Sequence, residues 1–434
     1  MRAPRVAVRP PVRQQPPPLP GGTVPKHPTD IMNIEALLSP EEIAVRDRVA
    51  EFVDRRVRPN IGQWFEDAVL PLELIPEMAE LGLFGMHLEG YGCAGRTATE
   101  YGIAMQEMEA GDSGLRTVVS VQGSLAMSSI HKHGSEEQKN EWLPKMAQGE
   151  AIGFFGLTEP TAGSDPASMV TRARLEGDEW VIDGAKRWIG LASVAQLGVV
   201  WAKVSNEDVA AADAAGALDL EIKDGKDGET VRGFIVPTDT EGFTATPITQ
   251  KLSMRASLQC DLTFEGMRLP LNAILPKNPG LRSPFMCLSE ARYGIAWGAM
   301  GAARDSIEQA IAYSSERLQF GKPLSAYQLT QKKLTDMTAG LQTGQLLALQ
   351  LGRAKDAGTL TPAMISLAKL NNCRTAIEIC REARTILGGN GITGDYSPLR
   401  HANNLESVRT YEGTDEVHTL IVGQTLTGEA AFRG

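Results

Sequence analysis

The run Tyr411-Glu412-Gly413-Thr414 places a carboxylate beside a glycine in a C-terminal segment of helical character. Because glycine carries no side chain, the backbone at this point can approach a ligand closely. A carboxylate in such a place can remove a proton from the ligand if burial raises its pKa toward neutrality. A glutamate beside a glycine is more often a solvated helix end. Glu412 therefore becomes a candidate general base only together with other motifs.

Three upstream motifs could form the rest of a ligand site: Phe155–Asp165 with the sequence FGLTEPTAGSD, Arg317–Lys322, and Leu387–Gly391. Their glycines let the backbone come near a planar or phosphorylated ligand, and their threonine and serine hydroxyls offer hydrogen bonds. Taken singly, each is better interpreted as a polar loop, a basic helix end or a glycine pair that ends a helix. All four motifs in this order and over this span are not expected by chance.

In these motifs and their order the chain resembles the acyl-CoA dehydrogenase family of flavoenzymes, from about Ile34 onward. Within that family it is most similar to the glutaryl-CoA dehydrogenases. The narrower resemblance rests on Tyr91–Gly95, Asp112–Arg116, Ala291–Trp297, and Thr410–Thr414 running into Leu420–Gly423. The resemblance implies an enzyme that desaturates an acyl thioester next to its carbonyl, with FAD as the hydride acceptor.

The resemblance also implies roles in that reaction. Glu412 would be the base that removes the α-proton, a contribution of roughly 10²–10⁴-fold. The thioester oxygen would be polarised by the Glu412 backbone N–H and a ribityl hydroxyl of the flavin, as in an oxyanion hole. The β-hydride would pass to the flavin, and the electrons would leave to an electron-transfer flavoprotein.

The implied FAD contacts are spread along the chain. Arg317 and Phe320 match positions that reach the FAD of a neighbouring subunit, so a homo-oligomer, usually a homotetramer, is implied. The matching positions are Phe155, Leu157, Thr158, Gly163, Ser164, Trp188, Ile189, Gly190, Arg317, Phe320, Gln328, Leu387, Gly388, Gly389, Thr414 and Glu416.

Substrate choice rests on a glutamate and an arginine. In the glutaryl-CoA dehydrogenases the arginine that matches Arg116 pairs with the distal carboxylate of the substrate, and the glutamate that matches Glu109 lies beside it. An arginine fork suits a carboxylate, and a cation in an apolar acyl pocket penalises a plain fatty acyl chain. Alternatively, the two residues form a structural ion pair at a helix boundary, because Asp112-Ser113-Gly114 breaks the helix between them. The local match favours the functional interpretation. The implied acyl-CoA contacts are Glu109, Arg116, Thr117, Ser164, Leu252, Ser253, Met254, Arg255, Ala256, Ser257, Arg292, Tyr411 and Gly413.

If the substrate is glutaryl-CoA, loss of the α-proton and β-hydride gives glutaconyl-CoA, whose distal carboxylate can leave as carbon dioxide to give crotonyl-CoA. Glu109 would steer the departing carboxylate, which favours the decarboxylating form. One departure from the family supports an alternative. Gly190 stands where a threonine is common, and Arg187–Gly190 resembles the short-chain acyl-CoA oxidases of plant peroxisomes. The alternatives are a short-chain acyl-CoA dehydrogenase or oxidase without decarboxylation, and a silent binding protein, against which the retained Glu412 speaks.

The composition is ordinary for a soluble globular protein, with 42% hydrophobic and 22% charged residues. The net charge of −10 argues against a nucleic acid partner, and no apolar run is long enough to span a membrane. Five cysteines without a Cys-x-x-Cys pair fit a reduced compartment, the cytoplasm of a bacterium first and the mitochondrial matrix second. His131 and His133 are two residues apart in a helical pattern, so no metal site is expected.

The chain reads as helical, then β, then helical again, which matches the α+β fold that the resemblance to the acyl-CoA dehydrogenases implies. We expect an N-terminal helical domain over residues 31–153, a central β-barrel domain over 154–278 and a C-terminal four-helix bundle over 279–434. Residues 1–30 are predicted to be a disordered Pro/Arg-rich tail. Its nine prolines prevent the amphipathic helix that a transit peptide needs.

Local patterns support these divisions. Ser39-Pro40-Glu41-Glu42 predicts a helix start with a capping box. Short runs of strand-forming residues at 180–182, 198–201 and 233–236, each bounded by Gly, Asp or Pro, indicate the β-domain. The polar segment Ser205–Thr230 lacks a sustained apolar stripe and is predicted to be a surface excursion between two strands.

Overall fold

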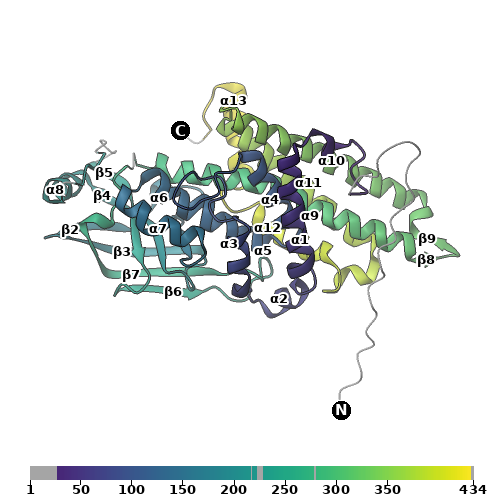
Figure 1. The fold of residues 1–434 in the computed structure, drawn as a ribbon, viewed down its shortest axis with the longest axis horizontal. Coiled ribbons are helices and arrows are strands. Elements are labelled where there is room, and N and C mark those ends of the chain that lie inside the picture. Colours follow the sequence, from purple (N-terminus) through teal and green to yellow (C-terminus); the bar gives the residue numbers. More distant parts are fainter. Residues whose placement is uncertain (1–26, 217, 222–227, 278–279, 432–434) are drawn as a thin grey trace, which may run out of the picture.

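The predicted α+β architecture is confirmed: the chain is helical, then β, then helical again (Figure 1). The strands gather at one end of the molecule, and the longest helices lie at the other. The computed structural model describes residues 27–216, 218–221, 228–277 and 280–431.

The N-terminal part is helical, as its apolar spacing predicts. The predicted capping box is present, because the Ser39 hydroxyl accepts from the Glu42 N–H at 3.3 Å and the Glu42 carboxylate accepts from the Ser39 N–H at 2.9 Å. A π-helical stretch over Ser120–Met127 joins two of the helices without a break. The helices are α1 (Pro40–Phe52), α2 (Ile61–Asp67), α3 (Ile75–Glu80), α4 (Ala98–Gly111), α5 (Ser113–Val119), α6 (Ser128–His133) and α7 (Glu136–Ala147).

The helices α4 and α5 lie at the centre of the molecule. Every residue of both helices is buried. A helix that is covered on all sides belongs to the core of a large domain. Side chains on these two helices therefore face other protein groups, so their polar members must find partners inside the protein.

The middle of the chain forms one seven-stranded sheet in the order β1-β4-β2-β3-β7-β6, with β5 also paired to β4. The predicted barrel thus takes the form of a half-barrel. The three predicted strand runs fall within β3, β4 and β5. The strands are β1 (Gly153–Gly156), β2 (Arg172–Glu176), β3 (Glu179–Gly190), β4 (Leu197–Ser205), β5 (Glu229–Pro237), β6 (Phe243–Pro247) and β7 (Gln259–Pro270).

The predicted excursion Ser205–Thr230 does lie between two strands, but part of it is the helix α8 (Asn206–Gly216). Val209 and Ala212, three residues apart, are completely buried in the core of the sheet domain. Two apolar positions on one helical turn are enough to seat a short helix on a sheet, although they make no sustained stripe. Residues 217 and 222–227 of this segment lie outside the described residues.

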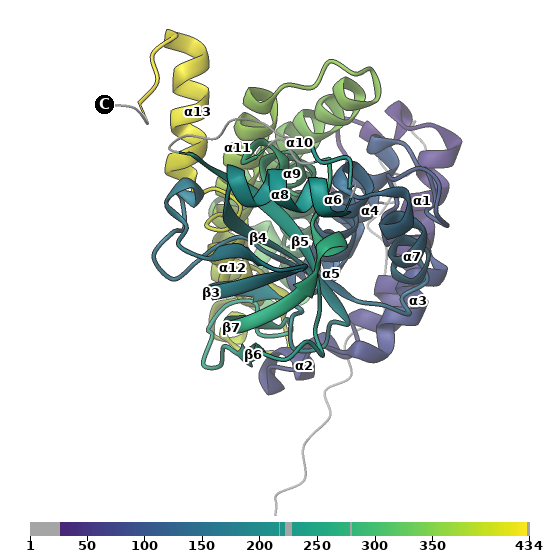
Figure 2. The ribbon, with the colours of Figure 1, turned by 90° about the vertical axis from the view of Figure 1, so that its left-hand side faces the viewer.

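The C-terminal part contains the predicted helical bundle. The helices are α9 (Arg282–Glu316), α10 (Gln328–Asp356), α11 (Pro362–Ile386), α12 (Ser397–Val408) and α13 (Asp415–Thr427). A small hairpin of β8 (Leu318–Gln319) and β9 (Lys322–Pro323) follows α9 and lies at the end of the molecule away from the sheet (Figure 1). In Figure 2, α13 projects from the rest of the body.

The end of the predicted tail belongs to the folded protein. His27 Nδ1 lies 2.7 Å from the Glu308 carboxylate on α9, and the Asp30 carboxylate accepts from the Ile34 N–H at 2.8 Å. The first contact ties the chain to the bundle before α1 begins, and the second fixes the local turn. Residues 1–26 of the predicted tail lie outside the described residues.

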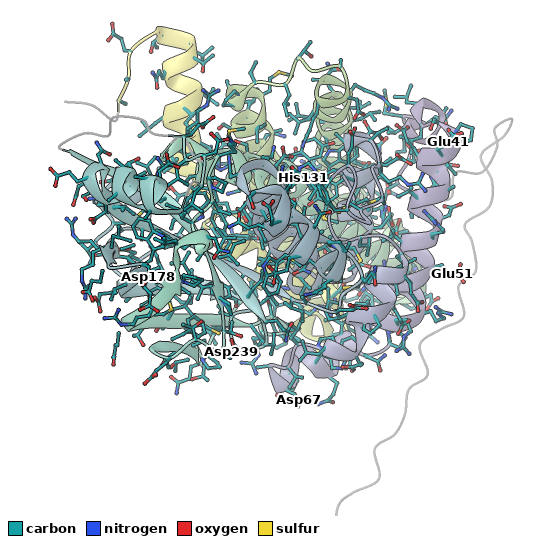
Figure 3. The ribbon with its side chains drawn as sticks, turned by 60° about the vertical axis from the view of Figure 1, so that its left-hand side comes forward. Glu41, Glu51, Asp67, His131, Asp178 and Asp239 are labelled. Carbon is teal, nitrogen blue, oxygen red and sulfur yellow. The ribbon has the colours of Figure 1, made fainter. Side chains whose placement is uncertain are left out.

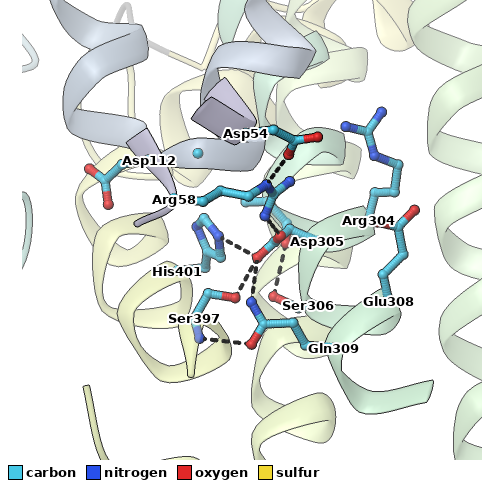
Figure 4. Close-up of polar contacts among 12 residues, drawn as sticks. Asp54, Arg58, Asp112, Arg304, Asp305, Ser306, Glu308, Gln309, Ser397 and His401 are labelled. Carbon is cyan, nitrogen blue, oxygen red and sulfur yellow. Dashed lines mark hydrogen bonds and ion pairs between the residues drawn. The ribbon is translucent and has the colours of Figure 1, made fainter. Parts of the chain in front are cut away.

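A buried polar cluster around Asp305 joins the N-terminal helices to the bundle (Figure 4). Asp305 on α9 accepts from Arg58 and from the Ser397 hydroxyl, and lies 3.1 Å from Nε2 of His401 on α12. Burial alone would raise the pKa of Asp305, but Arg58 and His401 hold it well below its usual range. The cluster fixes α12 against α9.

Acidic side chains are exposed both on the N-terminal helices and on the sheet domain. In Figure 3, Glu41 and Glu51 lie on α1, and Asp67 lies at the end of α2. Asp178 and Asp239 lie in turns of the sheet domain. All five are exposed.

Candidate active site

Glu412 lies in the turn that joins α12 to α13. Its φ of 56° is in the left-handed region, and Gly413 follows with a φ of 101°. A Cβ on residue 413 would also lie 2.8 Å from Nε2 of His418 on α13. The turn therefore requires glycine after the glutamate. Backbone strain of the kind seen at Glu412 persists where the surrounding structure holds it, often at functional sites.

Glu412 is half-buried, and one oxygen of its carboxyl is shielded from water. Its Oε2 is buried without a hydrogen-bond partner among the described residues. Burial raises the pKa of the carboxyl above its ordinary value, and the positive charges of Arg116, Lys369 and Arg292 oppose that rise. Within the described part of the chain, the Glu412 N–H also has no acceptor. A carboxylate and an N–H that are both available can take a proton and stabilise an oxyanion on one ligand.

Two cations hold the main chain of this turn. Lys369 on α11 donates from Nζ to the carbonyl oxygens of Tyr411 at 2.7 Å and Gly413 at 2.6 Å. Arg292 on α9 donates from Nε to the Glu412 carbonyl oxygen at 2.6 Å. Three consecutive carbonyls therefore accept from positive groups. The sequence predicts that Arg292 contacts the polar part of the ligand. In the structure its Nε donates to the main chain of the turn instead.

A completely buried ion pair lies beside this turn. Nε of Arg116 on α5 is 2.7 Å from Oε2 of Glu109 on α4, and neither side chain is exposed. Oε1 of Glu109 accepts from the Ser113 hydroxyl at 2.9 Å. The predicted helix break between them is present, because Asp112 has an extended backbone and caps α5. The two charges thus meet across the corner between α4 and α5.

The space for this pair comes from Gly298 on α9. A Cβ at this position would lie 2.1 Å from Oε2 of Glu109 and 3.3 Å from Nε of Arg116. Nothing in the local sequence around this glycine predicts that role, because the two partners lie more than a hundred residues upstream.

One of the remaining N–H groups of Arg116 contacts Tyr411, the residue before Glu412. Nη2 donates to the Tyr411 hydroxyl, which also lies 3.4 Å from the Thr117 hydroxyl. Nη1 is buried and has no hydrogen-bond partner among the described residues. Burial alone would lower the pKa of Arg116, but Tyr411 and Glu109 raise it above its ordinary value, so the guanidinium stays charged. A buried N–H without a partner is rare, and a ligand carboxylate would satisfy it.

The segment predicted to cover the acyl chain is the loop that leads into β7. Nζ of Lys251 lies inside this loop and donates to the carbonyl oxygens of Met254 at 2.9 Å and Ser257 at 2.7 Å. Met254 has a φ of 53°, and its N–H donates to the Asn404 side chain on α12 at 2.8 Å. The loop is therefore fixed both internally and to the helix that precedes Glu412.

Members of this loop differ in their availability to a ligand. Leu252 is 81% exposed, whereas Ala256 is completely buried. The Ser253 hydroxyl lies 2.6 Å from that of Ser407 on α12. Arg255 donates to main-chain carbonyls of residues 65 and 66, at 2.8 and 2.6 Å. Arg255 thus anchors the loop to α2, and of these residues Leu252 is the most open to a ligand.

The predicted flavin loop follows β1. Phe155 and Leu157 are buried, Thr158 is half-buried, and Gly163 and Ser164 are exposed. The chain thus leaves the sheet core and reaches the surface within this motif. A buried pair anchors its start, as Nζ of Lys186 on β3 lies 2.8 Å from the Glu159 carboxylate and also donates to the main chain of the loop at 3.1 Å.

The next predicted cofactor residues lie at the end of β3. Trp188 has a φ of 64° and is 52% exposed, and Ile189 is buried. Gly190 pairs with Gln259 on β7. A Cβ on Gly190 would lie 3.2 Å from Val121, so this valine takes up room that a threonine would need.

The remaining predicted cofactor residues are on the bundle and its hairpin. Phe320, at the hairpin tip, is 96% exposed, and Arg317 beside it is also exposed. Figure 1 places this hairpin and β3 at opposite ends of the molecule. Elsewhere on the bundle, Gln328, Gly388, Gly389 and Glu416 are exposed, Leu387 is buried, and Thr414 accepts from the Val417 N–H at 3.3 Å as the cap of α13.

Within the described ranges, no three or more His, Cys, Asp or Glu side chains are grouped so that they could hold a metal ion. No helix of those ranges is long and apolar enough to cross a membrane.

Sequence reasoning missed Lys369, which contacts the turn on both sides of Glu412. Its signal was present in the sequence: Lys369 lies four residues after Ile365 and four before Cys373, which places it on the apolar face of α11. A lysine on such a face needs buried acceptors. Lys186 and Gly298 gave no comparable local signal.

Three family models match successive parts of the chain. They are described as the N-terminal domain (residues 39–150), the middle domain (154–267) and the C-terminal domain (278–427) of acyl-CoA dehydrogenases.

Solved structures and a curated relative agree with that match. A glutaryl-CoA dehydrogenase of Mycobacterium smegmatis in complex with FADH2 is 55% identical, with a TM-score of 0.87 over 94% of this chain and 99% of that one. A glutaryl-CoA dehydrogenase in complex with glutaryl-CoA is 28% identical, with a TM-score of 0.82 over 91% of this chain and 98% of that one. The human mitochondrial short-chain specific acyl-CoA dehydrogenase is 33% identical over 87% of each chain.

Proposed function

The chain belongs to the acyl-CoA dehydrogenase family, and from that premise we propose that it is a glutaryl-CoA dehydrogenase, which oxidises and decarboxylates glutaryl-CoA to crotonyl-CoA and carbon dioxide. The likeness to the mycobacterial enzyme, 55% identical over 94% of this chain, supports the substrate. The family implies FAD as cofactor and electron acceptor from the substrate.

The observation that carries the substrate proposal is the buried Nη1 of Arg116, which has no partner among the described residues. The guanidinium is oriented by Glu109 on one side and Tyr411 on the other. A distal carboxylate would satisfy Nη1, whereas a plain acyl chain would leave it unpaired, at a cost of about 1–3 kcal/mol or more. The site therefore favours a dicarboxylic acyl thioester.

The residues present fit FAD. A Cβ on Gly163, Gly388 or Gly389 would meet no atom within 4 Å, so the backbone there is open to a ligand. Trp188 in the sheet domain offers a half-exposed indole. The preceding residue, Arg187, donates from its N–H to the Thr158 carbonyl oxygen of the predicted flavin loop at 2.9 Å. When bound, FAD supplies the acceptor for the β-hydride. In this proposal the predicted FAD contacts hold it.

Proton transfer belongs to Glu412. Its carboxylate takes the α-proton, and burial makes it a stronger base than a carboxylate in water. Its backbone N–H, which has no acceptor among the described residues, donates to the thioester oxygen as negative charge develops there. One residue thus supplies both the base and an oxyanion donor.

The second half of the reaction uses the ion pair. Arg116 binds the distal carboxylate during oxidation, and the anionic Glu109 lies at the guanidinium's other edge. When the carboxylate leaves as carbon dioxide, its electrons flow into the conjugated thioester. The protonated Glu412 then returns its proton to the dienolate, which gives crotonyl-CoA.

A second candidate is a short-chain acyl-CoA dehydrogenase or oxidase that does not decarboxylate. Gly190, packed against Val121, favours it, because a threonine is common at this family position. The similarity to the human short-chain specific enzyme also supports it. In this candidate the Glu109–Arg116 pair is purely structural.

We also propose an electron-transfer flavoprotein as acceptor, a homotetramer and the cytoplasm of a bacterium. The exposed hairpin supports the assembly, since Phe320 at 96% and Leu318 at 59% exposure are apolar groups that a neighbouring subunit would cover.

The test is anaerobic mixing of the FAD-loaded protein with glutaryl-CoA and, separately, butyryl-CoA. Bleaching of the flavin with glutaryl-CoA, followed by carbon dioxide and crotonyl-CoA on turnover, is the expected result. Bleaching with butyryl-CoA alone would overturn the substrate proposal. Repeating the reaction in air with peroxide detection separates dehydrogenase from oxidase.

A further inference from the structure

The turn that carries Glu412 is held by a lysine that enters from a different helix. Nζ of Lys369 on α11 lies 2.7 Å from the carbonyl oxygen of Tyr411 and 2.6 Å from that of Gly413. Glu412 lies between these two residues and has the left-handed φ of 56°. One ammonium group thus clamps the residue on each side of the candidate base.

Lys369 is 1% exposed, and among the described residues no side-chain carboxylate lies within hydrogen-bonding distance of its ammonium group. A buried lysine without a carboxylate partner is costly, and a neutral glutamine or methionine would avoid that cost. The nearby negative charges that favour the ammonium are Glu412 and Asp415, in the turn and at the start of α13. The positive charge of Lys369 is in turn one of those that lower the pKa of Glu412 against the effect of burial.

We propose that Lys369 is a positioning residue for proton abstraction: it holds the turn so that Glu412 keeps its strained conformation, and it keeps the carboxylate ionised before substrate binds. This inference rests on the proposed role of Glu412 as the base, but not on glutaryl-CoA as the substrate. Arg292 completes the clamp at the Glu412 carbonyl and has the same effect from α9.

Groups near the turn that changed their charge between pH 5 and 7 would also shift the pH dependence assigned to Glu412. Burial lowers the pKa of His418 to about 3 and raises that of Cys373 to about 12, so both are neutral between pH 5 and 7. Burial lowers the pKa of Lys369 to about 8, so it stays charged in that window. The groups that face Lys369 or Glu412 are Arg116 on α5, Arg292 on α9, Cys373 on α11, Tyr411 and Asp415 at the turn, and His418 on α13.

The readout is exchange of the α-hydrogens of a butyryl-CoA analogue that carries sulfur in place of the β-carbon, followed by mass spectrometry in D₂O. No hydride can leave this analogue, so exchange reports proton abstraction alone. The pH dependence of the exchange rate gives the pKa of the base. The kcat and KM for the acyl-CoA substrate are measured in parallel.

Two variants separate position from charge. Lys369→Gln removes the charge, so the exchange rate falls roughly 10²-fold and its acid limb moves up by about one pH unit. Lys369→Arg keeps the charge but cannot place one nitrogen between the two carbonyls. In that variant the rate falls while the acid limb stays in place. KM changes little in both, because neither change touches the acyl pocket.

The matched control is Lys333→Gln. Lys333 on α10 pairs with Glu382 on α11 at the surface, so this change removes a lysine charge next to the same helix without touching the turn. Its exchange rate and acid limb stay at the wild-type values.

Wild-type rate and acid limb in Lys369→Arg, or in a folded Lys369→Gln, would overturn the proposal. If Lys369→Gln does not fold, the exchange rate of Lys369→Arg alone decides whether the proposal holds. If Glu412→Gln exchanges as fast as wild type, the base assignment fails and Lys369 fails with it. If the analogue exchanges but glutaryl-CoA does not bleach the flavin, the proposed substrate is wrong, and the test of Lys369 remains valid.

Discussion

The acid–base region and the predicted cofactor residues differ in how completely one chain builds them. Glu109 and Arg116 are fully buried and bonded to each other, and the turn at Glu412 is clamped by two cations. In contrast, Phe320 is 96% exposed and Trp188 is 52% exposed. Intramolecular contacts build most of the first region and leave Nη1 of Arg116 and Oε2 of Glu412 without a partner among the described residues. The second is open to a ligand and to another chain.

This difference predicts where substitutions act. In the closed region a change leaves a buried charge or carbonyl without its partner, so stability and chemistry respond together. In the open region a change removes surface that is already in water, so the fold is little affected and binding responds.

Glu412→Gln has the largest expected effect. Glutamine cannot accept the α-proton, so kcat falls roughly 10²–10⁴-fold, measured by anaerobic flavin bleaching. FAD content stays at the wild-type level because the change lies in the closed region. The control Glu406→Gln alters an exposed carboxylate on α12 that pairs with Arg381, and leaves kcat unchanged. Loss of FAD from Glu412→Gln would break the contrast.

Arg116→Met comes next. It leaves Glu109 as an unpaired buried charge, which lowers the free energy of unfolding by about 3–5 kcal/mol in a denaturant titration. It also removes the preference for glutaryl-CoA over butyryl-CoA, expressed as the ratio of kcat/KM values.

A second buried pair provides the matched control for that variant. Arg304 on α9 binds Glu107 on α4 through both guanidinium ends, at 2.6 and 2.7 Å. Arg304→Met loses similar stability but keeps the substrate preference, because Arg304 does not contact Tyr411. An equal loss of preference in both variants would mean that Arg116 acts only through stability.

Phe320→Ala tests the open region. Removing an exposed ring changes the free energy of unfolding of the chain by less than about 0.5 kcal/mol. If a neighbouring subunit buries the ring, the variant weakens assembly or FAD retention by about 1.5–3 kcal/mol. Sedimentation and FAD titration measure both, and Val69→Ala, at another exposed apolar side chain, changes neither. Unchanged assembly and FAD binding would contradict the role of the hairpin.

The smallest effect is on pH dependence. Burial raises the pKa of Glu412 above 4.5, so the acid limb of kcat/KM lies above pH 4.5, because the protonated carboxyl cannot accept a proton. A raised carboxyl pKa means that the folded state is favoured at low pH and that this contribution is lost as pH rises through the folded-state pKa. The Tm of Glu412→Gln should therefore rise relative to the Tm of the wild type as the pH increases from 4 to 7. A constant difference would show that the carboxyl is well solvated.

Much of the fold and part of the site follow from local pattern. The capping box at Ser39 and the helix break at Asp112 depend on neighbouring residues, and both are present. Contacts between distant segments could not be predicted in this way. The attachment of Arg255 to α2 and of Arg292 to the Glu412 carbonyl depends on how separate elements pack. The same holds for Val209 and Ala212 of α8, whose burial depends on the sheet beneath them.

Gly298 leaves room for the ion pair because it has no side chain. A single methyl group there would displace the Glu109 carboxylate and, with it, the Arg116 guanidinium that it orients. If Arg116 selects the substrate as proposed, substrate range could thus shift through a residue on α9 while Glu109 and Arg116 stay unchanged. A search of variants for altered substrate range should begin at this helix.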